Sequence, residues 1–266
     1  TKDRYSNEGL TAICNVRDTP GPIARNVQDI ILLDQVLSGK VFENKINNLK
    51  GLRFGISNGY FCTNLEPEVK ITFERVKTIL EKAGVELVDI NVSKIIQLHN
   101  EFSSISLFYA SKVNFEEYLE KYNCPASLND IVSKIVSPDV KLIYEEYIMK
   151  NKITSEQNDH AENVIRPALI NAYHELFNEH NLSAMIFPTI PCMPIKFSDI
   201  TDQTMGLFIR NTSPSSVSGM PGISIPMQNS TNTMPIGLEI DGLNNDDHSI
   251  LCIALLLENL FNKELN

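Results

Sequence analysis

Apolar residues recur at helical spacing in several stretches of the chain, and shorter apolar runs of strand length lie between them. The first helical stretch ends at Gly39, a residue suited to the position after a helix. Its apolar positions are Val27, Ile30, Ile31, Leu33 and Leu37. A second helix is predicted from Pro67, which favours the first helical turn, to Gly84.

Five segments have the length and composition of strands. They are Arg53–Ser57, Val85–Val92, Ala184–Pro188, Gly222–Met227 and Pro235–Ile240. The first two flank the helix after Pro67, and this strand-helix-strand order predicts a right-handed crossover between parallel neighbours.

Residues 94–180 are predicted to be mostly helical, with breaks at Pro125 and Pro138. A long helix is expected over Ser155–Asn178, with Ser155 as its N-cap and a kink or division at Pro167. A last helix is expected over Asp246–Leu260. Strands that alternate with helices predict an α/β fold, a mixed β-sheet flanked by helices on both sides.

The chain has 266 residues and a formal net charge of −10. This charge argues against nucleic acid as a partner, because phosphate binding needs a surplus of lysine and arginine. The apolar run Ile250–Leu257 is too short to span a bilayer, so no membrane partner is expected. Five cysteines without CxxC spacing indicate reduced thiols. A cytoplasmic location is the expectation from these features.

Candidate chemistry is sparse among the histidines and cysteines. No HExxH motif or histidine–cysteine ligand spacing is present, so no metal site is predicted, and the histidines are expected at the surface. Cys192 follows the turn at Pro191 and is expected to be a buried inert thiol, because nothing near it in the sequence promises an activating histidine.

The serine pairs have a structural interpretation and a functional one. Ser215-Ser216 is the candidate for a nucleophile, but it lacks flanking glycines and is expected to lie in a polar loop. Ser103-Ser104 is expected in a helix as a solvated or capping pair. Gly219 and Gly222 bracket Pro221 before an apolar strand, where they permit close backbone approach beside a cavity or form a plain turn.

Six segments, in this order, together resemble the amidase-signature hydrolases. They are Arg17–Arg25 (RDTPGPIAR), Leu49–Ile56 (LKGLRFGI), Phe187–Pro191 (FPTIP), Arg210–Thr212 (RNT), Gly219–Pro226 (GMPGISIP) and Met234–Ile240 (MPIGLEI). Within that family the resemblance is to mandelamide and indoleacetamide hydrolases, although Asp3 stands where those relatives usually have glycine.

The resemblance implies that residues 1–266 are the C-terminal portion of a single amidase domain, with a helical cap region at about 94–180. The family cleaves carboxamides with a Ser-cis-Ser-Lys triad and a glycine-rich oxyanion loop. In the family these groups precede the segment that Arg4-Tyr5-Ser6 resembles, and this sequence contains no Gly-Gly pair. The resemblance therefore implies no catalytic residue within this chain, and no cofactor.

What the resemblance assigns to this chain is the substrate side of the pocket. Its candidate residues for contact with a small carboxamide, such as an arylacetamide, are Phe208, Asn211, Thr212, Ile190 and Pro191, for each of which the alternative is loop packing. The expected partner is the protein's own N-terminal part, on the same chain or a separate one. Without it we expect an exposed sheet edge and either aggregation or a homodimer.

The sequence is also compatible with two alternatives. One is a non-catalytic amidase remnant that acts as a binding or interaction module. The other is an α/β ligand-binding domain unrelated to amidases, for which the ordered matches would be chance.

Overall fold

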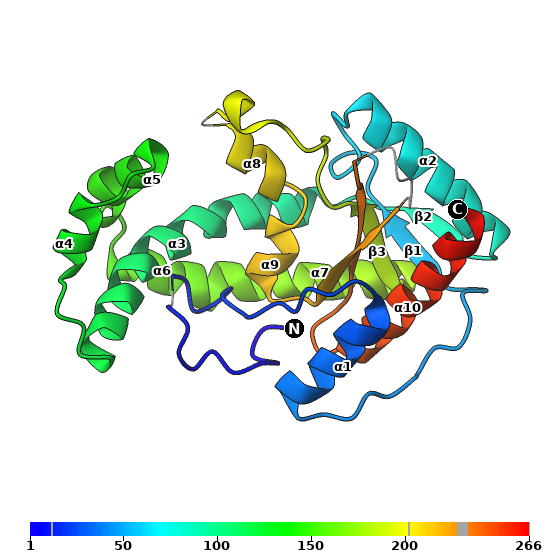
Figure 1. The fold of residues 1–266 in the computed structure, drawn as a ribbon, viewed down its shortest axis with the longest axis horizontal. Coiled ribbons are helices and arrows are strands. Elements are labelled where there is room, and N and C mark those ends of the chain that lie inside the picture. Colours follow the sequence, from blue (N-terminus) through cyan, green and yellow to red (C-terminus); the bar gives the residue numbers. More distant parts are fainter. Residues whose placement is uncertain (12, 202, 228–233, 266) are drawn as a thin grey trace.

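A five-stranded mixed sheet forms the centre of the protein (Figure 1). The computed structural model describes residues 1–11, 13–201, 203–227 and 234–265. The strands are β1 (Arg53–Ile56), β2 (Glu86–Asp89), β3 (Ala184–Pro188), β4 (Gly222–Pro226) and β5 (Gly237–Asp241). Their order is β2-β1-β3-β5-β4, with β1 parallel to β2 and β3, and β5 antiparallel to β3 and β4.

Helices surround this sheet and form most of the remaining regular structure. Before β3 they are α1 (Val27–Ser38), α2 (Pro67–Lys82), α3 (Ser93–Lys121), α4 (Leu128–Ser133), α5 (Pro138–Ile143), the π-helical turn η1 (Tyr144–Ile148), α6 (Ser155–His160), the π-helical turn η2 (Ala161–Ile165) and α7 (Arg166–His180). After β3 they are the 3₁₀ turn η3 (Phe197–Asp199), α8 (Thr204–Ile209), α9 (Ser213–Ser218) and α10 (Asp247–Glu264).

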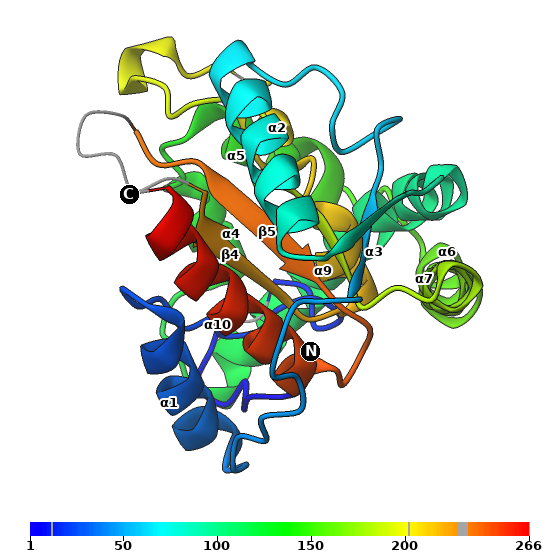
Figure 2. The ribbon, with the colours of Figure 1, turned by 90° about the vertical axis from the view of Figure 1, so that its right-hand side faces the viewer.

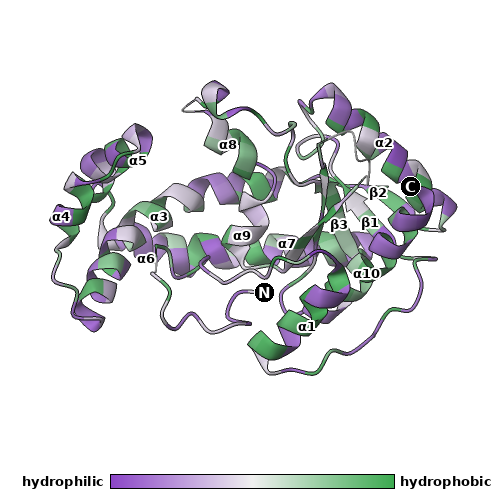
Figure 3. Ribbon diagram, in the orientation of Figure 1, coloured by the Kyte–Doolittle hydropathy of each residue, from purple (hydrophilic) through white to green (hydrophobic). Residues whose placement is uncertain are grey.

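The sheet buries its two faces against different sets of helices, because successive side chains of a strand point to opposite faces. On β3, Ile186 packs in a core with residues of α1, α2 and α10. Met185 and Phe187 pack in a second core with α3 and α7. Figure 2 shows α1, α2 and α10 in front of the sheet, and Figure 3 shows the apolar character of the central strands. The predicted mixed α/β fold is confirmed.

Local sequence explains where the first two helices begin and end. Asn26 caps α1 by accepting a hydrogen bond from the backbone N–H of Asp29, and Gly39 ends the helix with a φ of 68°. Pro67 lies in the first turn of α2, where its missing N–H costs nothing. Both helices occupy the predicted segments.

The segment between β2 and β3 is helical, as the sequence predicts, but its long C-terminal helix differs in detail. Thr154 is the N-cap rather than Ser155, because the Thr154 side chain accepts from the N–H of Gln157 in a capping box. The π-helical turn η2 ends at Ile165, two residues before Pro167, and the ring nitrogen of Pro167 cannot donate to the carbonyl of Asn163. The proline therefore divides the helix, as expected. That this segment acts as a cap region stays a prediction.

Two further expectations about local structure are wrong. Ser215-Ser216 does not lie in a loop: Pro214 starts the short helix α9, and Gly219 ends it with a φ of 75°. His99 is not at the surface, since it is 9% exposed where α3 packs against α9. Among the described residues, no helix has the length and apolar composition needed to cross a bilayer.

Candidate functional site

A pocket of about 570 Å³ opens beside β4. Two backbone segments provide much of its wall, Thr19–Val27 and Gly219–Pro226, and the first turns of α10 close one side with Ile250 and Leu251. Thr212, Ser215 and Ser216 reach the pocket from α9 and the residue before it. A volume of this size suits a small organic molecule.

Both glycines of the Gly219–Gly222 turn line this pocket, as the sequence suggests for a close backbone approach. Gly219 has a φ of 75°, which disfavours any other residue. A Cβ on Gly222 would lie 2.5 Å from Oδ1 of Asp241 and 2.9 Å from Oε1 of Glu239. Gly222 is therefore required by the two carboxyl groups of β5, and not by its own backbone conformation.

Glu239 and Asp241 are the most perturbed acids beside the pocket. Both are buried, with 8% and 2% of their surface exposed. Burial raises the pKa of Glu239 to about 7, and a hydrogen bond from Thr189 opposes the shift. Burial and the neighbouring Glu239 raise the pKa of Asp241 well above its ordinary value, with Ser215 acting against them. Groups with perturbed pKa values beside a pocket are candidates for function.

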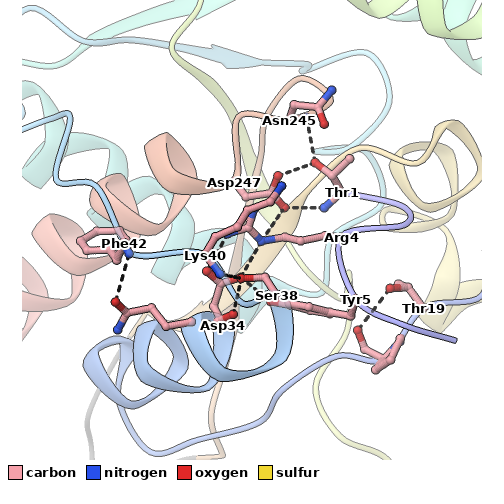
Figure 4. A network of polar contacts seen from close by, with 12 residues as sticks. Thr1, Arg4, Tyr5, Thr19, Asp34, Ser38, Lys40, Phe42, Asn245 and Asp247 are labelled. Carbon is pink, nitrogen blue, oxygen red and sulfur yellow. Dashed lines mark hydrogen bonds and ion pairs between the residues drawn. The ribbon is translucent and has the colours of Figure 1, made fainter. Parts of the chain in front are cut away.

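A buried ionic network supports the opposite side of the pocket (Figure 4). Asp34 of α1 accepts two hydrogen bonds from Arg4, of 2.5 and 2.6 Å, and one of 2.7 Å from the hydroxyl of Tyr5. Burial opposes ionisation of Asp34, but these donors hold its pKa below the ordinary value. Asp247, at the start of α10, accepts from Thr1 and lies 3.7 Å from Nε of Arg4. The network joins the N-terminal segment to α1 and α10.

The predicted substrate-side residues divide into two groups. Thr212 lines the pocket, whereas Phe208, Asn211, Ile190 and Pro191 lie outside its wall. Ile190 is 39% exposed and Phe208 is half-buried on α8, while Pro191 is buried. Substrate contact by these residues stays a prediction.

Asn211 is fully buried, and its side-chain amide joins three segments. The amide nitrogen donates to the carbonyl oxygens of Phe61 (3.1 Å) and Pro188 (2.7 Å), and the neighbouring Arg210 donates to the carbonyls of Phe61 and Thr63. These bonds fix the junction between α8 and α9 against the end of β3. Asn211 thereby sets the position of Thr212.

Replacing Asn211 with alanine is expected to lower the free energy of unfolding by about 2 kcal/mol, because the buried carbonyl of Pro188 loses its side-chain donor and that of Phe61 keeps only the bond from Arg210. Urea denaturation monitored by circular dichroism measures this loss. Ser216→Ala is the matched control, since Ser216 is exposed on α9 and its side chain makes no hydrogen bond among the described residues. Equal stability of both variants would show that the Asn211 amide does not hold the junction.

The other polar residues singled out in the sequence have structural partners. His99 Nε2 lies 2.8 Å from Oγ of Ser213, and Ser103 accepts from Arg17. Cys192 is half-buried and not buried as expected. Its partial burial, with a further contribution from Glu66, raises its pKa, which is the reverse of what a nucleophilic thiol requires. Among the described residues no three histidine, cysteine or acidic side chains form a potential metal site.

Sequence reasoning did not single out Glu239 or Asp241. The available signal was the alternation Leu238-Glu239-Ile240-Asp241, two acids at every second position of an otherwise apolar strand. Such an alternation is also typical of an ordinary solvated strand face. Only the packing shows that this face is buried.

The fold and the pocket define the class of the protein: an α/β protein with a mixed sheet, helices on both faces and a small-molecule pocket beside an edge strand. The family model described as Amidase matches residues 1–251. The chain belongs to the amidase family.

Individual relatives agree with this assignment. The chain is 32% identical over 270 residues to an indoleacetamide hydrolase of Agrobacterium vitis, covering 98% of this chain and 58% of that protein. It is 33% identical to a mandelamide hydrolase of Pseudomonas putida, covering 99% and 54%. The native peptide amidase of Stenotrophomonas maltophilia has the same fold, with a TM-score of 0.67 at 18% identity, covering 98% of this chain and 57% of that one. The chain thus spans little more than half the length of these relatives.

Proposed function

We propose that this chain forms the substrate-pocket side of an amidase that hydrolyses a small carboxamide to a carboxylate and ammonia. The match to the Amidase family over residues 1–251 carries this proposal. Because the chain spans 54–58% of the curated relatives, the proposal assigns the Ser-cis-Ser-Lys segment to an N-terminal part, on the same chain or another. The N-terminal part is then a partner of the surface beside β4.

The open edge of the sheet at β4 is evidence that an N-terminal part binds there. Among the described strands, β4 pairs only with β5, so its other edge presents unpaired backbone groups. Gly222, Ser224 and Pro226 are exposed on this strand. The pocket lies beside the same strand, so an additional strand or loop at this edge would complete the pocket wall.

The exposed surface of α1 is a second observation in favour of an interface with the N-terminal part. Leu32 and Val36 are 59% and 73% exposed, although α1 packs against α10 and buries Val27 and Ile31 in the core that the two helices share. Ile23, which precedes the helix and lines the pocket, is 95% exposed. Exposed apolar residues gathered on one element are typical of an interface. Here the interface would extend from the pocket along α1. A homodimer through this surface is the competing arrangement.

The residues of this chain would hold the substrate rather than attack it. Met220, Ile223 and Ile250 give the pocket an apolar wall, which suits the aryl group of a substrate such as an arylacetamide. We propose that Thr212 contacts this substrate, with Phe208, Asn211, Ile190 and Pro191 behind it. The names of the indoleacetamide and mandelamide hydrolases support an arylacetamide as substrate. The cytoplasmic location expected from the sequence stays a prediction.

A complementation experiment tests the proposal. The native gene product, or residues 1–266 co-expressed with an N-terminal part from the mandelamide hydrolase relative, is treated with a fluorophosphonate probe and assayed for ammonia release from phenylacetamide. We expect a labelled serine outside residues 1–266 and amide hydrolysis, and neither for residues 1–266 alone.

Two outcomes would contradict this proposal. A labelled serine within residues 1–266 alone would place the nucleophile in this chain. A native gene product without labelling or hydrolysis would make the chain a non-catalytic binding module. Light scattering of residues 1–266 alone tests the interface separately, because an uncovered edge is expected to produce dimers or aggregates.

A further inference from the structure

Two carboxyl groups lie side by side on the face of β5 that borders the pocket. Glu239 and Asp241 are two residues apart on the strand, so their side chains point to the same face. Glu239 pairs with Ser224 and Asp241 with Gly222 on the neighbouring strand β4. Glu239 forms part of the pocket wall, as do Gly222 and Ser224. The pair is therefore adjacent to the space in which a ligand would lie.

The two carboxyl groups face a common space above Gly222. A Cβ at this position would approach an oxygen of each group to less than 3 Å, so glycine leaves room there. No hydrogen bond between Glu239 and Asp241 occurs in the described part of the chain, and Oδ1 of Asp241 has no partner at all. A buried acceptor without a donor is costly, and its presence beside a pocket indicates a missing donor.

Hydroxyl groups surround this space, and no lysine or arginine of the described residues pairs with either acid. Oγ1 of Thr189 lies 2.5 Å from Oγ of Ser224, and Thr189 also hydrogen-bonds Glu239. Ser215 from α9 hydrogen-bonds Asp241, and the phenol of Tyr173 from α7 is the other titratable group that faces it. None of the ion pairs among the described residues includes either acid.

The charge of the two carboxyl groups limits which ligand could donate hydrogen bonds to them. Burial raises both pKa values, so the pair holds a proton at a higher pH than two free carboxyl groups would. A divalent metal would need a larger set of ligands than the described residues provide. A small monocation with several N–H donors suits carboxyl groups that share a proton, and its donors can reach the unpaired Oδ1 of Asp241 and the neighbouring oxygen of Glu239.

We propose that Glu239 and Asp241 form a binding site for the ammonium ion, placed over Gly222 at the wall of the pocket. This proposal rests on the proposed function, because hydrolysis of a carboxamide releases ammonia. The released ammonia takes the proton that the two carboxyl groups hold: an N–H bond forms, an O–H bond breaks, and no electron is transferred. The resulting ammonium ion is bound by the carboxylate that the transfer leaves behind.

The experiment measures the thermal unfolding midpoint of the native gene product in ammonium chloride, sodium chloride and tetramethylammonium chloride at equal concentration. For the wild-type chain we expect the midpoint in ammonium to exceed that in sodium by about 2 °C, because a ligand that binds only the folded state stabilises it. Tetramethylammonium has the same charge but no N–H donor and should give no such increase.

Four variants locate the effect. Glu239→Gln and Asp241→Asn are nearly isosteric and should abolish the ammonium-specific increase, and Gly222→Ala should abolish it by filling the space. Glu258→Gln is the matched control, because Glu258 lines the same pocket but already accepts from the N–H of Val27. It should retain the increase. Titration of ¹⁵N-ammonium followed by NMR measures binding directly should a variant fold poorly.

Equal unfolding midpoints in ammonium and sodium would overturn the proposed ammonium site. An unchanged ammonium-specific increase in Glu239→Gln would overturn it as well. Ammonia release by the complete protein separates this result from the proposed function. Hydrolysis without an ammonium effect overturns only the ammonium site. An ammonium effect without hydrolysis supports the site and overturns the proposed function.

Discussion

Replacing Arg4 with methionine is expected to lower the free energy of unfolding by about 3–5 kcal/mol, because the substitution leaves a buried carboxylate without its counter-ion. The Arg4 and Asp34 side chains are only 6% and 1% exposed. Two parallel hydrogen bonds join them, and Asp247 lies 3.7 Å from the same guanidinium. In the variant, the hydroxyl of Tyr5 would be the one remaining side-chain donor to Asp34 among the described residues, with the charge of Asp247 nearby.

Urea denaturation monitored by circular dichroism measures this loss as a shift in midpoint at constant slope. Lys121→Met is the control, since the ion pair of Lys121 with Glu8 is exposed on both sides and its loss should leave the midpoint unchanged. The double variant Arg4→Met, Asp34→Leu should recover part of the stability, because no charge remains unpaired. A loss below about 1 kcal/mol for Arg4→Met would contradict the role given to this pair.

The second large effect is a change in how stability depends on pH. Glu239→Gln is expected to make the protein more stable than the wild type by about 2–3 kcal/mol at pH 8, with much less difference at pH 5. The cause is the pKa of Glu239, which burial raises from 4.5 to about 7, since each pKa unit corresponds to about 1.4 kcal/mol.

The direction of this pH dependence follows from the number of protons that the folded and unfolded states bind. Between about pH 4.5 and 7 the folded protein keeps a proton on Glu239 that the unfolded chain has released, so stability falls as the pH rises and levels off above pH 7. Glutamine has no charge to bury and removes this dependence. Asp241→Asn should act in the same direction, because the pKa of Asp241 is also raised.

The measurement is the difference in unfolding free energy between wild type and variant at several pH values from 5 to 8. The pKa of His99 is lowered by burial, so this residue gives the opposite dependence, but it is present in both proteins and cancels in the difference. The pKa values of Asp34 and Asp247 are lowered, so their effects lie below pH 4. A difference independent of pH would show that Glu239 is ionised in the folded protein throughout this range.

The sequence predicted the elements well where local signals were strong. Asn26, Gly39 and Pro67 mark helix ends through hydrogen bonds and backbone preferences that act within a few residues. The short apolar runs correctly predict the strands, although the observed ends differ from the predicted ones by up to three residues, because pairing with neighbours decides where a strand stops. The loop predicted for the serine pair at 215–216 is a helix in the structure, since a polar stretch between a proline and a glycine suits a short helix as well as a loop.

The candidate site was predictable only in part. Thr212 and the glycines at 219 and 222 do line the pocket. Asn211 was expected to face a substrate, whereas its amide donates to the backbone of two other segments. These partners lie 150 and 23 residues away along the chain, so no local pattern indicates them.

The sequence by itself therefore determined the family, the α/β class, and the order of most helices and strands, because periodicity and turn residues act locally. Only the tertiary structure decided that Arg4 meets Asp34 and that Glu239 and Asp241 are buried beside a pocket. Charged residues in a sequence carry no sign of burial. Their pKa values and their chemistry are set by dielectric surroundings and partners that long-range packing brings together.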